Sequence, residues 1–326
     1  MRRHGPGSRC GGVPPVPRFV RSAPVAGLLL LCFAAHGLAQ QRGAPPTPFS
    51  ARDLVEGTQA DERKCAEQEG AVWVSHKLGT ECLATYASHP APKPDQVPPE
   101  ALVIYLHGDH LSGGKSLGDY EKITPETLVR NMRRQSFKPG VVYLLLARPG
   151  VFGSSGDHKQ RRRAKEFHSI AAAIETLRER YRRPSIVVVG QSGGSAAIGA
   201  VLTLGARNIA CAVMGSGVYA VNARAEFRRR LLGQPSRPGC DVTGYCDAYE
   251  SIDHIASIVR DPARRLIVVG DPRDQNTPFA LQLDWVERLR KAGHGVEVVE
   301  TEGRGPDHHG VTRTSFQLAR GCIPSP

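Results

Sequence analysis

The chain has 326 residues, of which 40% are hydrophobic and 23% are charged, and its formal net charge is +12. This length allows one large domain or two, with room for a substantial core. The densest basic runs, 159–165 and 228–230, lack the clustering with aromatic or base-reading residues that a nucleic-acid surface needs. We therefore expect solvated helix or loop surfaces there and no nucleic-acid partner.

The first 39 residues have the layout of a secretory signal peptide. They contain five arginines and no acidic residue, and an apolar run at 27–35 precedes small residues at Gly37 and Ala39. The apolar run is shorter than the roughly 20 residues of a membrane span. We therefore expect cleavage after residue 39, no stable membrane association afterwards, and a periplasmic or secreted protein.

Removal of residues 1–39 also changes the charge. Five arginines leave with this segment, so the formal net charge falls from +12 to +7 and the mature protein is only mildly basic. Residues 40–64, which begin with a proline-rich stretch, are expected to be a flexible leader. Residues 65–326 are expected to form a single domain.

An even number of cysteines in an exported chain suggests disulfides. After cleavage six remain, which are Cys65, Cys82, Cys211, Cys240, Cys246 and Cys322. The local pairs are Cys65 with Cys82, across a predicted hairpin, and Cys240 with Cys246, within one loop. Cys211 lies in a buried-looking strand, which suits a packed free thiol as well as a bridged one.

From residue 71 onward, apolar strands alternate with helices. A hairpin is predicted at 71–76 and 81–86 around a glycine-containing turn. The later strands are predicted at 101–106, 141–146, 186–189, 209–214, 266–269 and 296–299, and the helices at 120–135, 158–181, 192–204, 278–292 and from about 310. Apolar strands that alternate with helices predict an α/β fold, with a mostly parallel sheet and helices on both faces.

The run 186–200 predicts a strand, a tight turn and a helix. Within it, Gly190, Ser192 and Gly194 fit the pattern G-x-S-x-G, in which a nucleophilic serine sits on a strained strand-to-helix turn. The glycines remove Cβ atoms where the two arms of the turn crowd together. Ser192 is therefore the candidate nucleophile.

A nucleophilic serine needs a base within hydrogen-bond reach and an acid that orients the base. The loop after the strand 266–269 contains two candidate acids, Asp274 and Asp271, at the end of a strand where ligand-facing residues of parallel sheets lie. The glycine-rich loop after the last strand contains His308 and His309. The choice between them is nearly even, and the glycine that follows slightly favours His309 as the base.

An oxyanion needs two preorganised N–H donors. The first expected donor is the backbone N–H of Gly193, and the second is that of Asp109, in the turn that follows the strand 101–106. A metal site that combines His107, His110 and His308 is disfavoured, because no cysteine or carboxylate set completes a zinc geometry. No metal and no cofactor are therefore expected.

Together, the residues from about 71 to 322 resemble the α/β-hydrolase family, and the compact layout is similar to its dienelactone-hydrolase and prolyl-oligopeptidase-like branch. The turn 148–156, with the pattern Arg-Pro-Gly-x-x-Gly-x-Ser, adds to the likeness. The resemblance implies an eight-stranded sheet, with Ser192 as nucleophile and His308 or His309 as base. It also favours Asp274 over Asp271 as the acid, because an aspartate followed closely by Thr277 and a helix resembles the acid turn of the family. The region 221–257, where members insert a lid, is modest and contains a cysteine loop rather than a long apolar cap.

The resemblance implies hydrolysis of an ester, thioester or amide through an acyl-enzyme. With the signal-peptide layout and the modest lid, the expectation is an exported carboxylesterase that acts on a small-molecule ester. The alternatives are a serine peptidase of the prolyl-oligopeptidase-like type, which would act on a short peptide, and a binding protein that keeps the fold without the activity. A serine, an aspartate and a histidine in this order, each after a predicted parallel strand, argue against the non-catalytic alternative.

Overall fold

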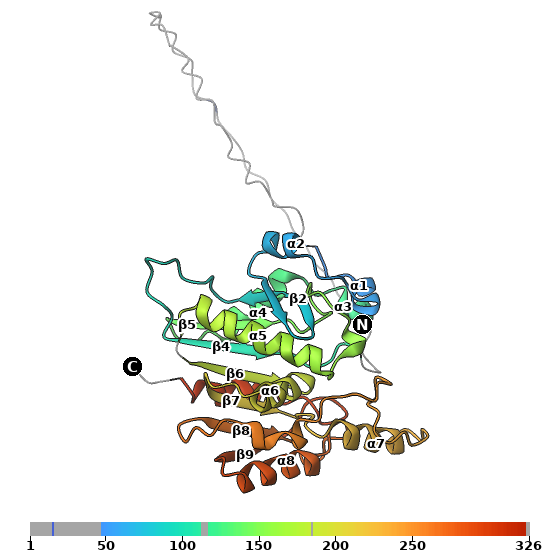
Figure 1. Cartoon of the computed structure of the whole chain (residues 1–326). Helices are drawn as coiled ribbons and strands as arrows, with labels where there is room; N and C mark the ends of the chain where they lie inside the picture. The colour runs from blue at the N-terminus through green and yellow to red at the C-terminus, as the bar shows by residue number, and fades with distance from the viewer. Residues whose placement is uncertain (1–14, 16–46, 112–116, 184, 324–326) are drawn as a thin grey trace, which may run out of the picture. The chain divides into compact units, whose positions relative to one another are not determined.

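The computed structural model describes residues 15, 47–111, 117–183 and 185–323. The predicted signal peptide, apart from Pro15, lies outside the described residues. Among those described, the central sheet has seven strands in the order β3-β5-β4-β6-β7-β8-β9 (Figure 1). All neighbours in it pair in parallel except β3 with β5. The predicted α/β architecture with a mostly parallel sheet is confirmed.

Most elements have nearly the predicted bounds. The strands are β1 (Val72–His76), β2 (Gly79–Leu83), β3 (Thr85–Ala87), β4 (Ala101–Leu106), β5 (Val141–Leu146), β6 (Ile186–Gln191), β7 (Ile209–Gly215), β8 (Arg265–Gly270) and β9 (Val296–Glu300). The helices are α1 (Ala51–Glu56), α2 (Glu62–Glu67), α3 (Leu117–Tyr120), α4 (Pro125–Gln135), α5 (Ala164–Arg180), α6 (Gly193–Thr203), α7 (Val221–Leu231), α8 (Phe279–Lys291) and α9 (Thr312–Arg320). Short 3₁₀ helices lie at His158–Gln160, Ser251–Asp253 and Ile255–Ser257.

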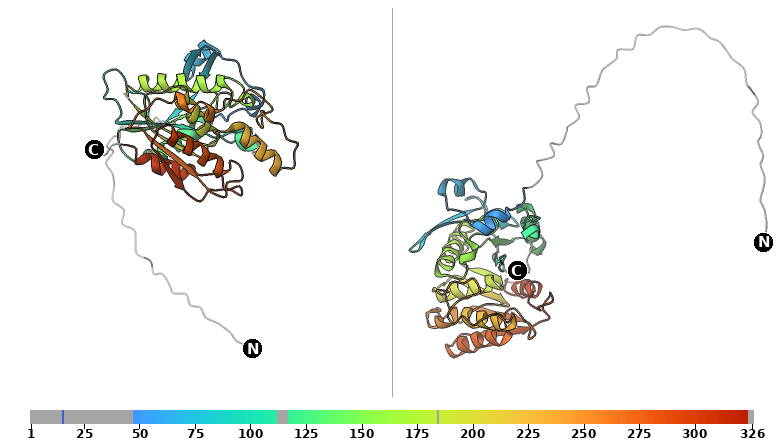
Figure 2. Two further views of the ribbon diagram at one scale, coloured as in Figure 1. Left: turned by 60° about the horizontal axis from the view of Figure 1, so that its bottom comes forward. Right: turned by 90° about the vertical axis from the view of Figure 1, so that its right-hand side faces the viewer.

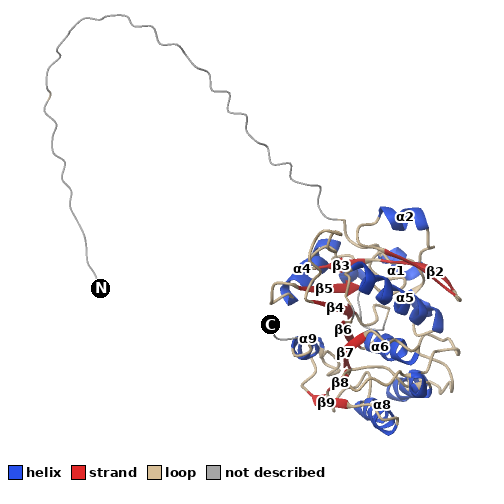
Figure 3. Cartoon of the chain, turned by 60° about the vertical axis from the view of Figure 1, so that its left-hand side comes forward, coloured by secondary structure: helices blue, strands red, loops and turns tan. Residues whose placement is uncertain are grey.

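Helices cover both faces of the sheet. Figure 3 shows α5, α6 and α8 on one side of the strands and α4 and α9 on the other. Because side chains alternate along a strand, β4 supplies Leu102, Ile104 and Leu106 to one buried cluster and Val103 to the other. The apolar run of this strand is therefore continuous because both of its faces are buried.

The strand count differs from the eight that the family resemblance implied. In the described part of the chain, β1 and β2 pair only with each other and form a separate two-stranded sheet. Figure 2 shows this hairpin beside α5, outside the central sheet. The predicted second hairpin strand, 81–86, divides near Ala84, because Thr85–Ala87 turns to pair with β5 as the antiparallel edge strand of the main sheet.

The expectation of a flexible leader at 40–64 is wrong for its described part. Residues 51–56 form α1, whose first turn is capped by the Ser50 side chain, and Leu54 of this helix is buried. Asp61 caps α2 in the same way. The described residues 47–64 fall within the compact unit that contains the central sheet, so they belong to the folded domain rather than preceding it.

Three disulfides join the described cysteines. Both predicted local pairs, Cys65–Cys82 and Cys240–Cys246, are present, although the first joins α2 to β2 rather than spanning the hairpin. The third bridge, Cys211–Cys322, links β7 to the residues that follow α9. None of the described helices combines the length and the apolar character needed to traverse a bilayer.

Candidate active site

Ser192 lies on a strained turn between β6 and α6. Its φ and ψ angles are 56° and −118°, in a region that residues with a Cβ rarely adopt. A Cβ at Gly190 would lie 2.7 Å from the Ser195 nitrogen, and one at Gly194 would overlap the Leu106 carbonyl oxygen. The glycines on both sides of Ser192 are therefore required by close backbone contact, as the sequence pattern predicts.

Asp274 and His309 meet above the C-terminal ends of the strands. His309 Nδ1 is 2.8 Å from Asp274 Oδ2. Asp274 Oδ1 accepts the backbone N–H groups of Asn276 and Thr277 at 2.8 and 2.9 Å, which fixes the carboxylate in its turn. The other ring nitrogen, His309 Nε2, is shielded from solvent and has no hydrogen-bond partner among the described residues. This nitrogen is thus available to a reacting group.

The alternative acid and base have different surroundings. Asp271 accepts hydrogen bonds from the Arg273 side chain and from the Gly303 backbone, and these bonds, led by that of Arg273, hold the pKa of Asp271 well below its usual range. The closest approach of His308 Nδ1 to the Asp271 carboxylate is 3.5 Å, with no hydrogen bond. Asp271 thus stabilises the loop that precedes the histidines by a hydrogen bond to Gly303, whereas Asp274 is the carboxylate that contacts His309.

Gln191, directly before the candidate nucleophile, connects two segments. These are the serine turn (190–194) and the histidine loop (303–310). Its Nε2 donates to the His309 carbonyl oxygen at 2.8 Å, and its Oε1 accepts the Val311 N–H at 3.2 Å. The Thr312 hydroxyl also donates to this Oε1. The sequence does not predict this role of Gln191, because the G-x-S-x-G pattern allows any residue at its position.

The predicted oxyanion turn lies against the serine turn. A Cβ on Gly108 would be 3.4 Å from Ser192 Cβ and 3.3 Å from the Gln191 carbonyl oxygen, so the two backbones approach closely here. A Cβ on Gly193 would overlap the Asp109 carboxylate and the Arg148 guanidinium. The structure therefore brings Asp109 and Gly193, the two predicted oxyanion donors, next to each other.

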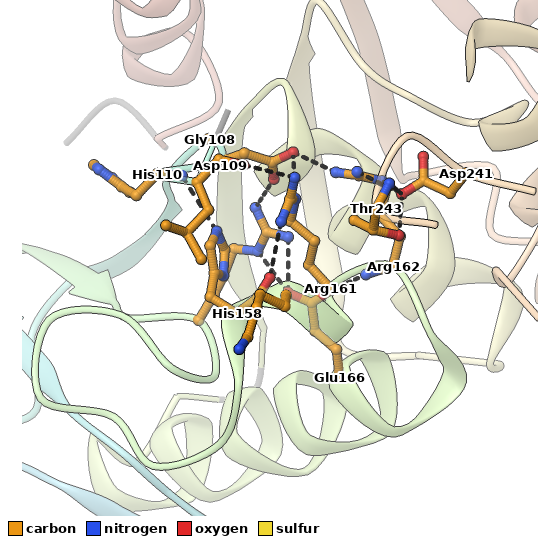
Figure 4. Close-up of polar contacts among 12 residues, drawn as sticks. Gly108, Asp109, His110, His158, Arg161, Arg162, Glu166, Asp241 and Thr243 are labelled. Carbon is orange, nitrogen blue, oxygen red and sulfur yellow. Dashed lines mark hydrogen bonds and ion pairs between the residues drawn. The ribbon is translucent and has the colours of Figure 1, made fainter. Parts of the chain in front are cut away.

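The Asp109 side chain is the centre of a buried ion cluster, drawn in Figure 4. It binds Arg148 at 2.8 Å, Arg161 at 3.1 Å and Arg162. Arg162 also binds Asp241 at 2.7 Å. Burial by itself would raise the pKa of Asp109, but the guanidinium groups of Arg162, Arg161 and Arg148 hold this pKa well below its usual range.

This cluster corrects the expectation that the basic runs are solvated. Arg162 is fully buried and Arg161 is 7% exposed, because both reach inward to carboxylates. In the second run, Arg229 is buried and paired with Glu226 at 2.7 Å. The basic runs themselves do not reveal these partners, since the aspartates that neutralise the first run come from distant segments.

The short insert after β7 contacts the loop 271–278, which contains Asp274 and is called the acid loop below. In the region 221–257, α7 is followed by irregular chain that contains the Cys240–Cys246 bridge, in agreement with the modest lid that the sequence predicts. Arg224 donates to the carbonyl oxygen of Asn276 at 3.1 Å, and Arg228 donates to that of Gln275 at 2.9 Å. The insert therefore lies beside the turn that holds Asp274.

The fold is that of known hydrolases. An esterase of Pyrococcus furiosus matches with a TM-score of 0.53 at 15% identity, over 86% of this chain and 96% of its own. Est1E of Butyrivibrio proteoclasticus, with ferulic acid bound, matches with a TM-score of 0.53 at 14% identity, over 77% and 97%. An acylaminoacyl peptidase of Pyrococcus horikoshii matches with a TM-score of 0.50 at 15% identity, over 78% of this chain but only 39% of the peptidase. No curated protein sequence matches the chain.

A sequence profile assigns the family. The profile of the prolyl oligopeptidase family matches residues 150–320, a segment that includes the serine turn, the acid loop and the histidine loop. The match covers more than half of the chain. The chain therefore belongs to the prolyl oligopeptidase family, and it is a serine hydrolase of the α/β-hydrolase fold.

Proposed function

We propose that the protein is an exported carboxylesterase in which Ser192, His309 and Asp274 form the catalytic triad. The observation that carries this proposal is the 2.8 Å contact of His309 Nδ1 with Asp274 Oδ2, which leaves the shielded Nε2 of His309 without a partner among the described residues. With Nδ1 protonated and bound to the carboxylate, Nε2 is the basic nitrogen of the ring. It is the atom that takes the proton of a serine nucleophile.

The reaction follows from these roles. Ser192 Oγ attacks the ester carbonyl carbon while its proton moves to His309 Nε2, and Asp274 stabilises the imidazolium that forms. The backbone N–H groups of Gly193 and Asp109 bind the oxyanion. As the bond between the carbonyl carbon and the alcohol oxygen breaks, Nε2 gives its proton to that oxygen, and an acyl group remains on Ser192. A water then attacks the acyl carbon while its proton moves to His309. The bond to Ser192 Oγ breaks, His309 returns the proton to Oγ, and the carboxylic acid leaves.

The lengths of the matched structures favour an ester over a peptide as the substrate. The P. furiosus esterase and Est1E match this chain over 96% and 97% of their own lengths, whereas only 39% of the acylaminoacyl peptidase is matched. A short-peptide substrate is the second candidate, and the membership in a family of prolyl oligopeptidases favours it. The binding protein without activity is the least favoured, because it gives no role to the contact between His309 and Asp274.

Export is supported by two independent features. The first is the signal-peptide layout of residues 1–39. The second is the presence of three disulfides in the described domain, since disulfides persist in oxidising compartments. A periplasmic or secreted location fits both features, and N-terminal sequencing of the protein recovered from the expressing cells should begin near Gln40.

A fluorophosphonate probe tests the serine assignment. The folded wild type should be labelled, mass spectrometry should place the adduct on Ser192, and Ser192→Ala should abolish labelling. Ser257→Ala, which changes an exposed serine of the same domain, should label like the wild type. Rates on 4-nitrophenyl esters of graded acyl length, compared with peptide 4-nitroanilides, separate esterase from peptidase. A folded wild type that is neither labelled nor active on either series would refute the proposal.

A further inference from the structure

Arg224, in the first turn of α7, is a buried cation without a carboxylate partner. Its side chain is only 7% exposed. Nε donates to the Asn276 carbonyl oxygen at 3.1 Å and Nη2 donates to Asn276 Oδ1, so both bonds go to neutral acceptors. Among the described residues, Arg224 forms no ion pair. A buried charge in this state is unfavourable unless an anion pairs with it.

Arg224 contacts the acid loop, which contains Asp274, through Asn276. Its hydrogen-bond partner, Asn276, uses its own backbone N–H to bind Asp274 Oδ1. The charges of Arg162, Asp109 and Asp241 also act on the guanidinium. Burial lowers the pKa of Arg224 to about 10, and the group therefore remains cationic at neutral pH.

The other buried guanidinium groups near Arg224 are each paired with a carboxylate. The ion cluster beside the oxyanion turn consists of three buried guanidinium groups and three carboxylates, which are Arg148, Arg161, Arg162, Asp109, Glu166 and Asp241. Arg224 is a fourth buried guanidinium. The carboxylate of Glu250 accepts the backbone N–H groups of Val221 and Asn222, at the start of the same helix, each at 2.7 Å. Among these four guanidinium groups, Arg224 is therefore the one that forms no ion pair with the described residues.

One end of the Arg224 guanidinium is free to bind a ligand. Nη1 donates no hydrogen bond to the described residues, and it is accessible to solvent. A guanidinium group presents its N–H groups in a plane that fits a carboxylate. Arg224 is therefore suited to bind a carboxylate, because its buried charge has only neutral partners and its Nη1 is accessible.

We infer that Arg224 binds a free carboxylate of the substrate, so that the enzyme prefers esters with a negatively charged group near the scissile bond. This inference rests on the proposed ester hydrolysis, because it names the substrate class of that same site. The carboxylate can belong to the acyl part, as in a monoester of a dicarboxylic acid, or to the leaving group. The chemistry that Arg224 recognises is the same in both cases.

Matched substrate pairs test the inference on the wild-type protein. For the acyl side, kcat/KM is compared between 4-nitrophenyl hydrogen glutarate and 4-nitrophenyl pentanoate. For the leaving-group side, it is compared between 4-acetoxybenzoate and its methyl ester. We expect the anionic member of one pair to be preferred by roughly 10- to 150-fold, the factor of one hydrogen-bonded charge. The pair that shows the preference identifies the position of the carboxylate.

Two variants assign the preference to its residue. Arg224→Met should reduce the ratio of anionic to neutral kcat/KM to near one, and Arg224→Lys, which keeps the charge, should retain part of it. Arg230→Met removes an exposed cation of the same helix and should leave the ratio unchanged. If Arg224→Met does not fold, inhibition of wild-type pentanoate ester hydrolysis decides. On the side that shows the preference, the anionic ligand should inhibit at least roughly tenfold more strongly than its neutral amide, which means glutaramate against glutaramide for the acyl side or 4-hydroxybenzoate against 4-hydroxybenzamide for the leaving-group side.

The outcomes separate this inference from the function on which it rests. A wild type that hydrolyses the neutral esters, shows no preference for either anionic ester and is inhibited equally by the anionic ligands and their neutral amides overturns the role of Arg224 and leaves the esterase proposal intact. A preference that persists in a folded Arg224→Met also overturns it. A folded wild type that hydrolyses no ester and takes no fluorophosphonate label overturns both.

Discussion

Replacement of Asp109 by asparagine tests how the site is held together. The substitution keeps the shape of the side chain and removes its negative charge. Asp109 pairs with three guanidinium groups that are 7% exposed or less, and only Glu166 and Asp241 would remain to balance them. The new amide group would also point N–H donors at guanidinium donors, so at least one buried charge would lose its acceptor.

The expected loss of stability is large. Removal of one partner from a buried ion pair costs about 3–5 kcal/mol, because the remaining charge is left without compensation. This is a substantial share of a total unfolding free energy of about 5–15 kcal/mol. With a urea m-value of about 3 kcal/mol per M, the unfolding midpoint of Asp109→Asn should fall by roughly 1–1.7 M.

The pH dependence has a defined sign. The folded-state pKa of Asp109 lies below its unfolded value, so its contribution to stability is fully present above the unfolded pKa of about 3.9 and is lost as pH falls through the folded pKa. The difference between wild type and Asp109→Asn should therefore be constant between about pH 5 and 8. Below about pH 4 it should shrink, because the wild type then loses the same charge.

Urea unfolding followed by circular dichroism, with the disulfides kept oxidised, measures these midpoints. Asp284→Asn is the matched control, because Asp284 pairs with Arg288 on the exposed face of α8 at 3.1 Å and surface pairs contribute little. Its midpoint should equal that of the wild type. A shift for Asp109→Asn that is no larger than that of the control at neutral pH would show that the arginines do not depend on this carboxylate.

Three further results are expected. His309→Ala should lower kcat for ester hydrolysis by about 10⁴-fold or more, while His308→Ala should have a milder effect, and the reverse order would assign the base to His308. Gly193→Ala should lower kcat by about 10²-fold in a folded protein, because the added methyl group displaces the oxyanion turn beside Ser192, and an unchanged kcat would contradict that contact. The double variant Cys65→Ser, Cys82→Ser should lose about 3 kcal/mol of unfolding free energy, since its bridge closes a loop with a sequence separation of 17, and calorimetry of both proteins gives the difference.

Patterns local in the chain were sufficient for the architecture. Apolar runs such as those of β4 and β5 show that strands are buried on both faces, and their alternation with helices implies a parallel sheet. The G-x-S-x-G pattern likewise predicts the strained turn at Ser192, because its glycines allow the close contacts that this turn makes. The short helices α1 and α2 were missed, although their capping residues Ser50 and Asp61 were visible signals.

Choices between neighbouring residues required the tertiary structure. Asp271 and Asp274 lie in one loop, and His308 and His309 are adjacent, so composition and spacing treat the members of each pair alike. The folded chain separates them, because His308 adopts a positive φ of 54° and comes near Asp271, whereas His309 faces Asp274 at 2.8 Å. The direction of a side chain depends on backbone angles that the surrounding loops impose.

Pairings between distant segments also depended on the fold. Cys211 and Cys322 are 111 positions apart, and Arg162 is separated from Asp109 by 53 positions and from Asp241 by 79. A local interpretation of the sequence therefore places Arg162 in a solvated run and leaves Cys211 undecided. The sequence by itself determined which segments form the sheet and where the candidate nucleophile stands. Only the tertiary structure decided which charges and thiols are neighbours, because contacts between remote segments are created by the packing of the strands and helices and leave no periodic signal in the chain.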